Sequence, residues 1–379
     1  MSIPFSRRIS RLAPSPVREM LQAACGRSIT SLAGGLPAES TFPDFPGFEH
    51  HGWEQYGVSE GDRPLRIAVS QHLMERGLTC PAERILILNG SQQGLDLAAK
   101  LFIDTHTPVL CESPTYVAAL QVFRLFGATL HSLPMTHQGP EPSLITAALE
   151  HSKAHMAYVI PNYQNPTGAV WSNEAREALA NACDKTGTVV LEDDPYGEIG
   201  FGDPLPAPVC SRLKAAPWMF LGSFSKSFVP GLRMGFLAAS PELFAKLELL
   251  KQAADLHSNR LSQALVLADL QDPNRPHRLD EVRAQYRKRR DQFAESLHRH
   301  FPDAVFQAPE GGLFFWARLS KTLDLRTIAP RAMQAGVAFL PGEHCFPDKP
   351  ELGWARLNFS HAAPDAADAA LKTLAGLMM

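Results

Sequence analysis

Two stretches of the chain decide its fold: TVVLEDDPY at residues 188–196 and WMFLGSFSK at residues 218–226. Each begins with a short apolar run that is typical of a buried β-strand. In each stretch the apolar run is followed by small, polar or charged residues, where the strand is expected to end. Because ligands of open α/β sheets bind beyond the carboxyl ends of the strands, these two ends are candidate functional positions.

Outward from these stretches, apolar runs alternate with helical patterns. We expect further strands at 85–88, 108–111, 129–133, 156–160 and 234–239. Helices are expected at 64–75, 115–126, 143–150 and 173–185, with another that ends at 101. This alternation predicts an α/β fold in which a mostly parallel sheet is covered by helices.

The pattern changes after residue 240. Long helices are expected at 241–256, 262–270 and 279–300, followed by strands at 304–308, 313–317, 337–340 and 355–359 and by helices at 325–335 and 364–377. This second part is typical of a smaller α+β domain. We therefore expect an N-terminal arm over 1–45, a large domain over 46–255, and an interdomain helix with a small C-terminal domain over 256–379.

Composition excludes several classes of protein. The chain has 379 residues, 45% of them hydrophobic and 20% charged, and a net charge of -3, so we expect no nucleic-acid partner. No apolar run reaches the roughly 18 residues of a membrane-spanning helix, and no secretory signal is visible. The six cysteines are scattered without a metal-ligand pattern, so we expect a cytoplasmic protein without metal, a transit peptide being the weaker alternative.

Five expected strand ends carry polar groups in one order along the chain. These groups are Ser91 and Gln92 after the first strand, then Tyr116, Asn165, the pair Asp193 and Tyr196, and finally Ser223, Ser225, Lys226 and Arg233. Each has an ordinary alternative: a helix cap, a packed tyrosine, a plain turn, a solvated acidic loop and a basic loop. Together they could hold a phosphate, stack on a flat ring, donate to a ring oxygen, pair with a ring nitrogen and supply an amine.

These residues resemble the class I/II aminotransferases, which are fold-type I pyridoxal-phosphate enzymes. The match runs from about Ser31 to the C-terminus and looks nearest to the α-aminoadipate/kynurenine aminotransferase branch. The motifs that carry it are SLAGGLP at 31–37, GSQQ at 90–93, NPTG at 165–168, EDDPY at 192–196 and GSFSK at 222–226. The resemblance implies a large domain on a mostly parallel seven-stranded sheet and a smaller α+β domain. Regulators that share this domain carry a DNA-binding module in front, and we expect none here because the first motif starts at Ser31.

The resemblance also implies the role of each site residue. Lys226 would carry pyridoxal 5'-phosphate as a Schiff base and move protons, with Asp193 at the pyridine nitrogen and Tyr116 stacked on the ring. Asn165 and Tyr196 would donate to the phenolate oxygen. The phosphate would be bound by Ser91, Gln92, Ser223, Ser225, Arg233 and, from a neighbouring subunit, Tyr56, so a homodimer is implied. Substrate would be bound by Arg356, which would grip the α-carboxylate, and by Arg18, Gly35 and Asn165.

The reaction implied is transfer of the amino group of an L-α-amino acid to a 2-oxo acid such as 2-oxoglutarate, by ping-pong steps through Lys226. Arg18 favours a 2-aminoadipate-like or glutamate-like donor, with aromatic and aliphatic donors tolerated; its alternative is a surface charge. The segment between Pro43 and Trp53 is shorter than in that branch, which fits a specialised biosynthetic enzyme. Lyase or oxidative-deaminase chemistry on the same scaffold is the alternative outcome. A cofactor sensor and a nicotinamide enzyme are weaker alternatives, the latter because no G-x-G-x-x-G follows an early strand.

Overall fold

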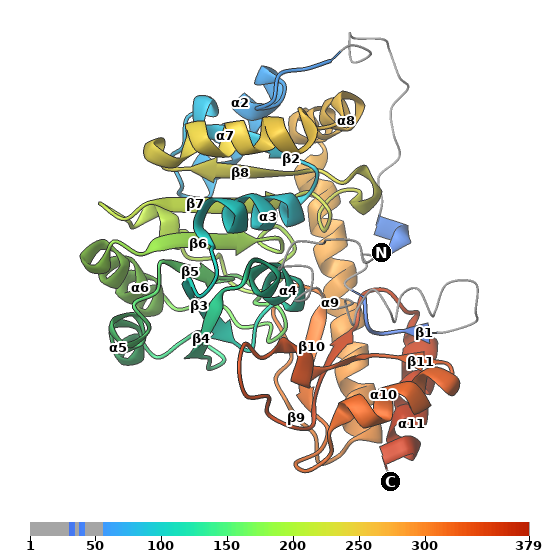
Figure 1. Ribbon diagram of the computed structural model, residues 1–379. Helices are drawn as coiled ribbons and strands as arrows, with labels where there is room; N and C mark the ends of the chain where they lie inside the picture. The colour runs from blue at the N-terminus through green and yellow to red at the C-terminus, as the bar shows by residue number, and fades with distance from the viewer. Residues whose placement is uncertain (1–29, 35–37, 42–55, 379) are drawn as a thin grey trace, which may run out of the picture.

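A computed structural model of the chain describes residues 30–34, 38–41 and 56–378. Within these residues the main feature is a seven-stranded sheet in the order β2-β8-β7-β6-β5-β3-β4 (Figure 1). Strands β7, β6, β5, β3 and β4 run parallel, whereas β8 is antiparallel to both of its neighbours. The predicted mostly parallel sheet is therefore confirmed.

The strands of this sheet are short, and all except the edge strand β4 are mainly buried, as the apolar runs predicted. Their bounds are β2 Ile85–Leu88, β3 Pro108–Ser113, β4 Thr129–Pro134, β5 Met156–Val159, β6 Val189–Asp194, β7 Trp218–Ser223 and β8 Gly235–Ala239. Helices cover both faces, and their bounds are α2 Arg63–Glu75, α3 Ser91–Phe102, α4 Val117–Phe126, α5 Pro142–Ser152, α6 Asn173–Thr186, α7 Pro241–Asp255 and α8 Arg260–Gln271.

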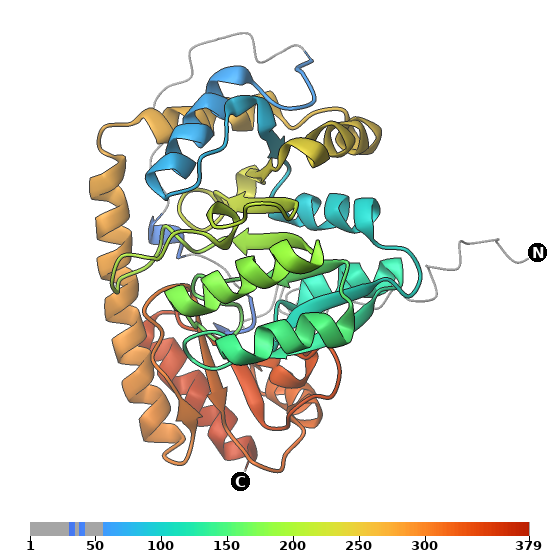
Figure 2. The same cartoon turned by 90° about the vertical axis from the view of Figure 1, so that its left-hand side faces the viewer.

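Two hydrophobic layers sandwich the sheet. Because successive side chains of a strand point to opposite faces, Ile85 and Ile87 pack in one layer and Leu86 and Leu88 in the other. The first layer includes side chains of α2, α5, α6 and α8, and the second includes side chains of α3, α4 and α7. Figure 2 shows α5 and α6 lying side by side over the first face.

A second, smaller sheet has its own core. It contains β12 Leu340–Pro341, β13 Trp354–Asn358, β10 Phe314–Arg318 and β9 Val305–Phe306, in that order. Helices α10 Leu325–Gln334 and α11 Pro364–Met378 pack with it. The long helix α9, Arg275–His300, runs beside both sheets (Figures 1 and 2). The predicted α/β part and α+β part are both present, while the exact domain boundaries stay predictions.

One predicted strand is wrong. The run 337–340 forms two strands in different sheets, because β11 Val337–Ala338 pairs in parallel with β1 Thr30–Ser31, whereas β12 pairs with β13. Phe339, between them, is 1% exposed, so its side chain is buried where the chain changes partner. Strand β1 itself was not expected from the sequence. Among the described residues, every helix is too short or too polar to span a bilayer.

A buried arginine fastens helix α6 to the loop that follows β5. Arg176 is fully buried, and its Nη2 donates to the carbonyl of Pro161 at 2.9 Å and to Oδ1 of Asn162 at 2.6 Å. Its Nε donates to the carbonyl of Trp171 at 3.1 Å. Since this loop continues to Asn165, the arginine supports one wall of the predicted site from the core.

Replacing this arginine tests its structural role. Arg176→Met leaves several buried oxygens without donors, each at a cost of about 1–3 kcal/mol, so we expect the free energy of unfolding to fall by about 3 kcal/mol. Denaturant unfolding of the protein without added cofactor measures the change. Glu177→Gln, at a half-exposed position of the same helix, is the control and should stay within about 0.5 kcal/mol of wild type. Equal stability of the two variants would contradict the bracing role.

Candidate active site

A cavity of about 300 Å³ lies beyond the carboxyl ends of the parallel strands. It brings together eleven of the residues predicted from the sequence: Ser91, Gln92, Tyr116, Asn165, Asp193, Tyr196, Ser223, Ser225, Lys226, Arg233 and Arg356. They come from segments up to 265 positions apart, Ser91 to Arg356. The residues that were predicted at the ends of separate strands therefore line one cavity of the folded chain.

One end of the cavity is suited to an anion. Ser91 is the first residue of α3, and Gly90 is the cap residue with a φ of 80°, so the alternative in which Ser91 caps the helix is wrong. A Cβ on Gly90 would lie 2.7 Å from Nη2 of Arg233, which means that glycine lets the guanidinium approach the helix start. Unpaired backbone N–H groups at a helix N-terminus and a nearby arginine are a typical phosphate-binding arrangement.

A buried carboxylate stands at the end of β6. Asp193 is 2% exposed, and its Oδ2 accepts a hydrogen bond from the hydroxyl of Tyr158 at 2.9 Å. Its Oδ1 is buried without a hydrogen-bond partner in the described part of the chain. Burial raises the pKa of Asp193 to about 7, against the effect of the Tyr158 hydrogen bond and helped by the charge of Asp194. A protonated ring nitrogen, as in pyridoxal phosphate, would satisfy the open oxygen, so this residue fits that cofactor.

The contact from Tyr158 was not predicted from the sequence. This residue lies in the expected strand at 156–160, where an aromatic side chain indicates packing. It does pack against Phe123, with 5.4 Å between ring centroids, while its hydroxyl reaches Asp193. The signal that could have identified it is its hydroxyl group, because a fully buried tyrosine usually has a hydrogen-bond partner.

Lys226 lies in the same cavity, just after β7. Burial lowers the pKa of Lys226 to about 8, and the positive charges of Arg233 and Arg356 act in the same direction. A substantial neutral fraction of the amine near pH 8 makes this lysine a usable nucleophile and base. The basic-loop alternative does not account for its position in the same buried cavity as Asp193.

Asn165 links two other predicted residues. Its Oδ1 accepts from Nη1 of Arg356 at 2.9 Å, and its Nδ2 lies 3.5 Å from the hydroxyl of Tyr196. This places the amide N–H₂ and the tyrosine hydroxyl next to each other in the cavity wall, where both can donate to one acceptor. A plain turn therefore does not explain the contacts that Asn165 makes with Arg356 and Tyr196.

Arg356 is a buried cation aimed at the cavity. It is 2% exposed, its Nη2 donates to the carbonyl of Ala33 at 2.8 Å, and its guanidinium lies 4.1 Å from the ring centre of Phe314. Among the described residues, no carboxylate lies within ion-pair distance of it. A buried arginine without a counter-charge is suited to bind a carboxylate ligand. Phe314, which was not predicted as a site residue, packs its ring against the guanidinium.

Of the other predicted residues, Tyr56 is described and does not line this cavity. Tyr56 is 77% exposed, and its ring contacts that of His257 with 5.6 Å between centroids. Arg18 and Gly35 lie outside the described residues. The homodimer and the substrate contacts predicted with these three residues therefore stay predictions.

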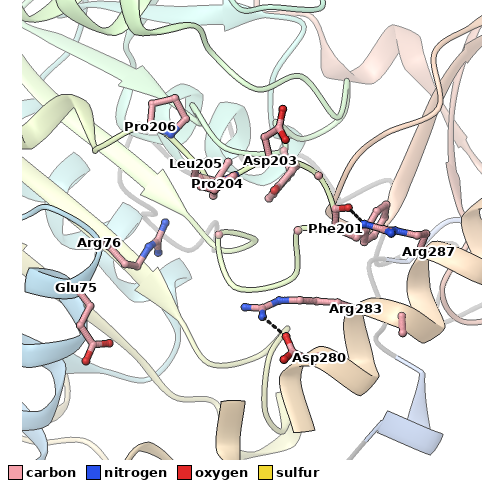
Figure 3. Close-up of a pocket in the computed structure, with 15 residues that line it drawn as sticks. Glu75, Arg76, Phe201, Asp203, Pro204, Leu205, Pro206, Asp280, Arg283 and Arg287 are labelled. Carbon is pink, nitrogen blue, oxygen red and sulfur yellow. Dashed lines mark hydrogen bonds and ion pairs between the residues drawn. The ribbon is translucent and has the colours of Figure 1, made fainter. Parts of the chain in front are cut away.

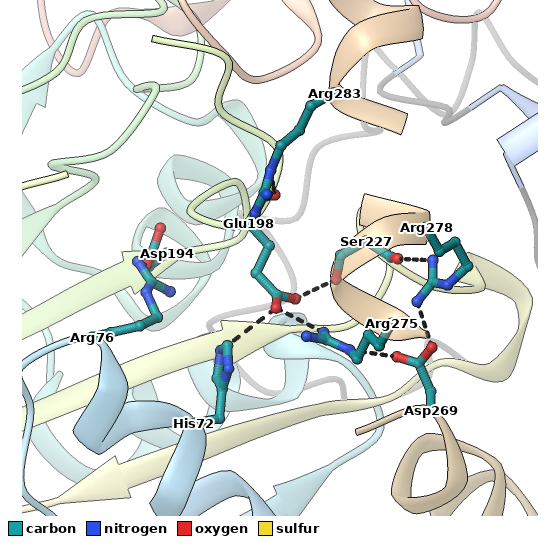
Figure 4. Close-up of polar contacts among 9 residues, drawn as sticks. All are labelled: His72, Arg76, Asp194, Glu198, Ser227, Asp269, Arg275, Arg278 and Arg283. Carbon is teal, nitrogen blue, oxygen red and sulfur yellow. Dashed lines mark hydrogen bonds and ion pairs between the residues drawn. The ribbon is translucent and has the colours of Figure 1, made fainter. Parts of the chain in front are cut away.

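A second cavity, of about 610 Å³, lies between the loop that follows β6, the end of α2 and helix α9 (Figure 3). Its lining includes Arg76, Arg283 and Arg287 but none of the predicted site residues. Arg76, just beyond α2, forms an ion pair with the fully buried side chain of Asp194 (Figure 4). Asp194, the neighbour of Asp193, is therefore paired with Arg76 outside the cofactor cavity.

Comparison with known proteins agrees with this site. Residues 39–374 match the family model of class I and II aminotransferases. The aromatic-amino-acid aminotransferase 1 of Thermococcus litoralis is 33% identical over 98% of this chain and 93% of its own length. The 2-aminoadipate transaminase of Thermus thermophilus is 37% identical over 89% of this chain and 87% of its own length.

A solved structure agrees in both fold and sequence. The α-aminoadipate aminotransferase of Thermus thermophilus, in complex with N-(5'-phosphopyridoxyl)-L-leucine, superposes with a TM-score of 0.89 at 33% identity. The match covers 99% of this chain and 97% of that one. Since both the family model and these relatives extend over most of the sequence, the chain belongs to the class I and II aminotransferases and is a pyridoxal-phosphate-dependent enzyme of that family.

Proposed function

We propose that this enzyme transfers the amino group of an L-α-amino acid to a 2-oxo acid such as 2-oxoglutarate. The observation that carries the proposal is that Arg356, a buried cation without a carboxylate partner among the described residues, shares a cavity with Lys226. A carboxylate bound at Arg356 would bring the adjacent carbon of an α-amino or 2-oxo acid near the lysine amine. Both substrates of such a transfer carry that carboxylate, so one arginine serves both halves of the reaction.

Pyridoxal phosphate, when bound, supplies an aldehyde for attachment to Lys226 and a ring that withdraws electrons. The residues of the chain hold and tune it. We assign its phosphate to Ser91, Gln92, Ser223, Ser225 and Arg233, its ring face to Tyr116, its ring oxygen to Asn165 and Tyr196, and its ring nitrogen to Asp193. Because Asp193 is buried, its charge acts with little screening by water and keeps the nitrogen protonated.

Lys226 is the proposed catalytic base and acid. With pyridoxal phosphate bound and the lysine released from it, the neutral amine of Lys226 would accept the proton from the substrate Cα and hold it for return. Donor and acceptor use the site in turn, so we propose ping-pong kinetics. Tyr56, which is largely exposed, is proposed to reach the phosphate of a neighbouring subunit in a cytoplasmic homodimer.

The proposed donors are 2-aminoadipate and glutamate, with aromatic and aliphatic amino acids tolerated. Relatives named for 2-aminoadipate and for aromatic amino acids support those two classes of donor. Arg18 is proposed to meet a distal carboxylate, and Gly35 to lie against the substrate. Together with Arg356, an arginine at each end of a dicarboxylic donor would favour that class over monocarboxylic donors.

The first experiment is a single half-reaction. Mixing the holoenzyme with L-2-aminoadipate or L-glutamate, without an acceptor, should change the absorption spectrum of the bound cofactor and release one 2-oxo acid per active site. Lys226→Ala is the matched control, since it should retain the cofactor non-covalently and release no oxo acid. Release of ammonia or of a fragment of the side chain would instead indicate deaminase or lyase chemistry and overturn the proposal.

The carboxylate role of Arg356 predicts a selective defect. Arg356→Ala removes a charge-assisted pair of hydrogen bonds, so the KM for the amino acid should rise roughly 100-fold. Arg318→Ala is the control, because Arg318 lies on the neighbouring strand over the ring of Trp354 and outside the cavity lining. Steady-state kinetics measure both. A KM for Arg356→Ala that equals that of the control would remove the assigned role.

The pKa of Lys226 predicts how attachment of the cofactor depends on pH. Only the neutral amine attacks the aldehyde, and the pKa of Lys226 is lowered to about 8. The rate of attachment to the apoprotein should therefore rise about tenfold per pH unit below pH 8 and level off above it. Stopped-flow absorbance follows the rate. A rise that continues without a break to pH 10 would indicate an unshifted lysine.

A further inference from the structure

One carboxylate joins the loop of Tyr196 to the loop of Lys226. Glu198 lies two positions after Tyr196, and its Oε2 accepts a hydrogen bond from the hydroxyl of Ser227 at 2.5 Å. Ser227 directly follows Lys226. Figure 4 shows this contact. Neither Glu198 nor Ser227 lines the cofactor cavity, so both lie outside the set of residues assigned to the cofactor.

Arg275 and His72 fix the position of this carboxylate, and Arg275 pairs with its charge. Oε1 of Glu198 accepts from Nη2 of Arg275 at 2.7 Å and lies 3.8 Å from Nε2 of His72. Burial by itself would raise the pKa of Glu198, but the charge of His72 when that ring is protonated, the charge of Arg275 and the hydrogen bonds from Ser227 and Arg275 lower it to about 2. Because burial lowers the pKa of His72, Arg275 is the cation that keeps Glu198 ionised near neutral pH. At any working pH the carboxylate is therefore ionised, and a charged acceptor makes a strong hydrogen bond to a hydroxyl group.

The backbone of Ser227 is held from the other side. Its carbonyl accepts from Nη1 of Arg278 at 2.8 Å, and the same guanidinium lies 5.6 Å from the ring centre of Phe228. Asp269 bridges Arg278 and Arg275 through its two carboxylate oxygens. The residue after Lys226 is thus bound at its side chain and its carbonyl by groups from α9 and the loop after β6 (Figure 4).

The loop that carries Glu198 is also held by Arg283, which lines the larger cavity. Nε of Arg283 on α9 donates to the carbonyl of Glu198 at 3.0 Å, and its Nη1 donates to Asp280 at 2.8 Å (Figure 3). Asp280 is 72% exposed and has no contact with Ser227 in the described structure. It therefore offers a control carboxylate in the same network that lies away from the lysine loop.

We propose that Glu198 is a positioning residue that holds Lys226 at the cofactor by binding Ser227, which rests on the function proposed above. With this contact in place, the lysine amine and the Tyr196 hydroxyl keep a fixed spacing, because one side chain joins the two loops. The rate of a proton transfer changes strongly when the reacting groups move by about 1 Å. A loosened Lys226 loop should therefore lower kcat. Substrate affinity should not change, because Arg356 binds the substrate.

The experiment compares Ser227→Ala, Ser227→Thr, Glu198→Gln and the control Asp280→Asn. In Ser227→Ala we expect kcat to fall about tenfold or more with an unchanged KM for the amino acid. Ser227→Thr, which keeps a hydroxyl, should recover most of the rate, and Asp280→Asn should match wild type. The double variant of Ser227→Ala with Glu198→Gln should be no slower than the slower of the two single variants, because both act through one contact.

A second measurement uses the protein without cofactor. The amide of Phe228 donates to the carbonyl of Phe224 at 3.0 Å across this loop. Its hydrogen exchange should be faster in Ser227→Ala and in Glu198→Gln than in Asp280→Asn. Exchange reports the contact between Glu198 and Ser227 even if no amino acid proves to be a donor, so failure of the proposed function and failure of this inference are distinguishable.

Three results would overturn the inference. A wild-type kcat in Ser227→Ala would show that the contact does not position the lysine. Losses that add in the double variant would show that the two residues act separately. Exchange at Phe228 that is equal in all variants would show that the loop is held without Glu198.

Discussion

Two adjacent carboxylates at the end of β6 are the constraint on which the rest of the active site depends. Asp193 and Asp194 are 2% and 3% exposed, and burying two neighbouring negative charges is costly unless each has a partner. Since successive strand residues face opposite ways, Asp193 points to the cofactor cavity and Asp194 to Arg76 on the other side. One carboxylate is neutralised within the chain, which leaves the other for the cofactor ring.

The walls of the cofactor cavity are braced from behind by groups that do not line it. Arg176 holds the segment that leads to Asn165, and Glu198 joins the Tyr196 loop to the Lys226 loop. Arg356, which does line the cavity, reaches from the smaller sheet to the amide of Asn165 in the loop that follows β5. The side chains that touch a ligand can therefore be chosen for chemistry, while separate buried polar groups fix where they stand.

The sequence predicted the strand ends well because short apolar runs and the residues after them are local features. Lys226, Asp193 and Asn165 each lie at or just beyond the end of a buried strand, and the sheet brings such ends together. Contacts that exist only after folding could not be predicted in this way. Glu198 looks like a loop residue until Arg275 and Ser227 meet it, and the pairing of β1 with β11 joins residues about 300 positions apart. Periodicity also could not show that the run around Phe339 divides between two sheets.

The absence of a side chain at Gly197 has an evolutionary consequence. A Cβ at this position would overlap Nη2 of Arg76 and lie 2.7 Å from Oδ2 of Asp194, so the ion pair occupies the space that any larger residue would need. Positions 76, 194 and 197 are therefore expected to change together during divergence. A descendant that loses Arg76 would leave the buried charge of Asp194 without its cation, so we expect both side chains to be replaced before position 197 accepts a larger residue.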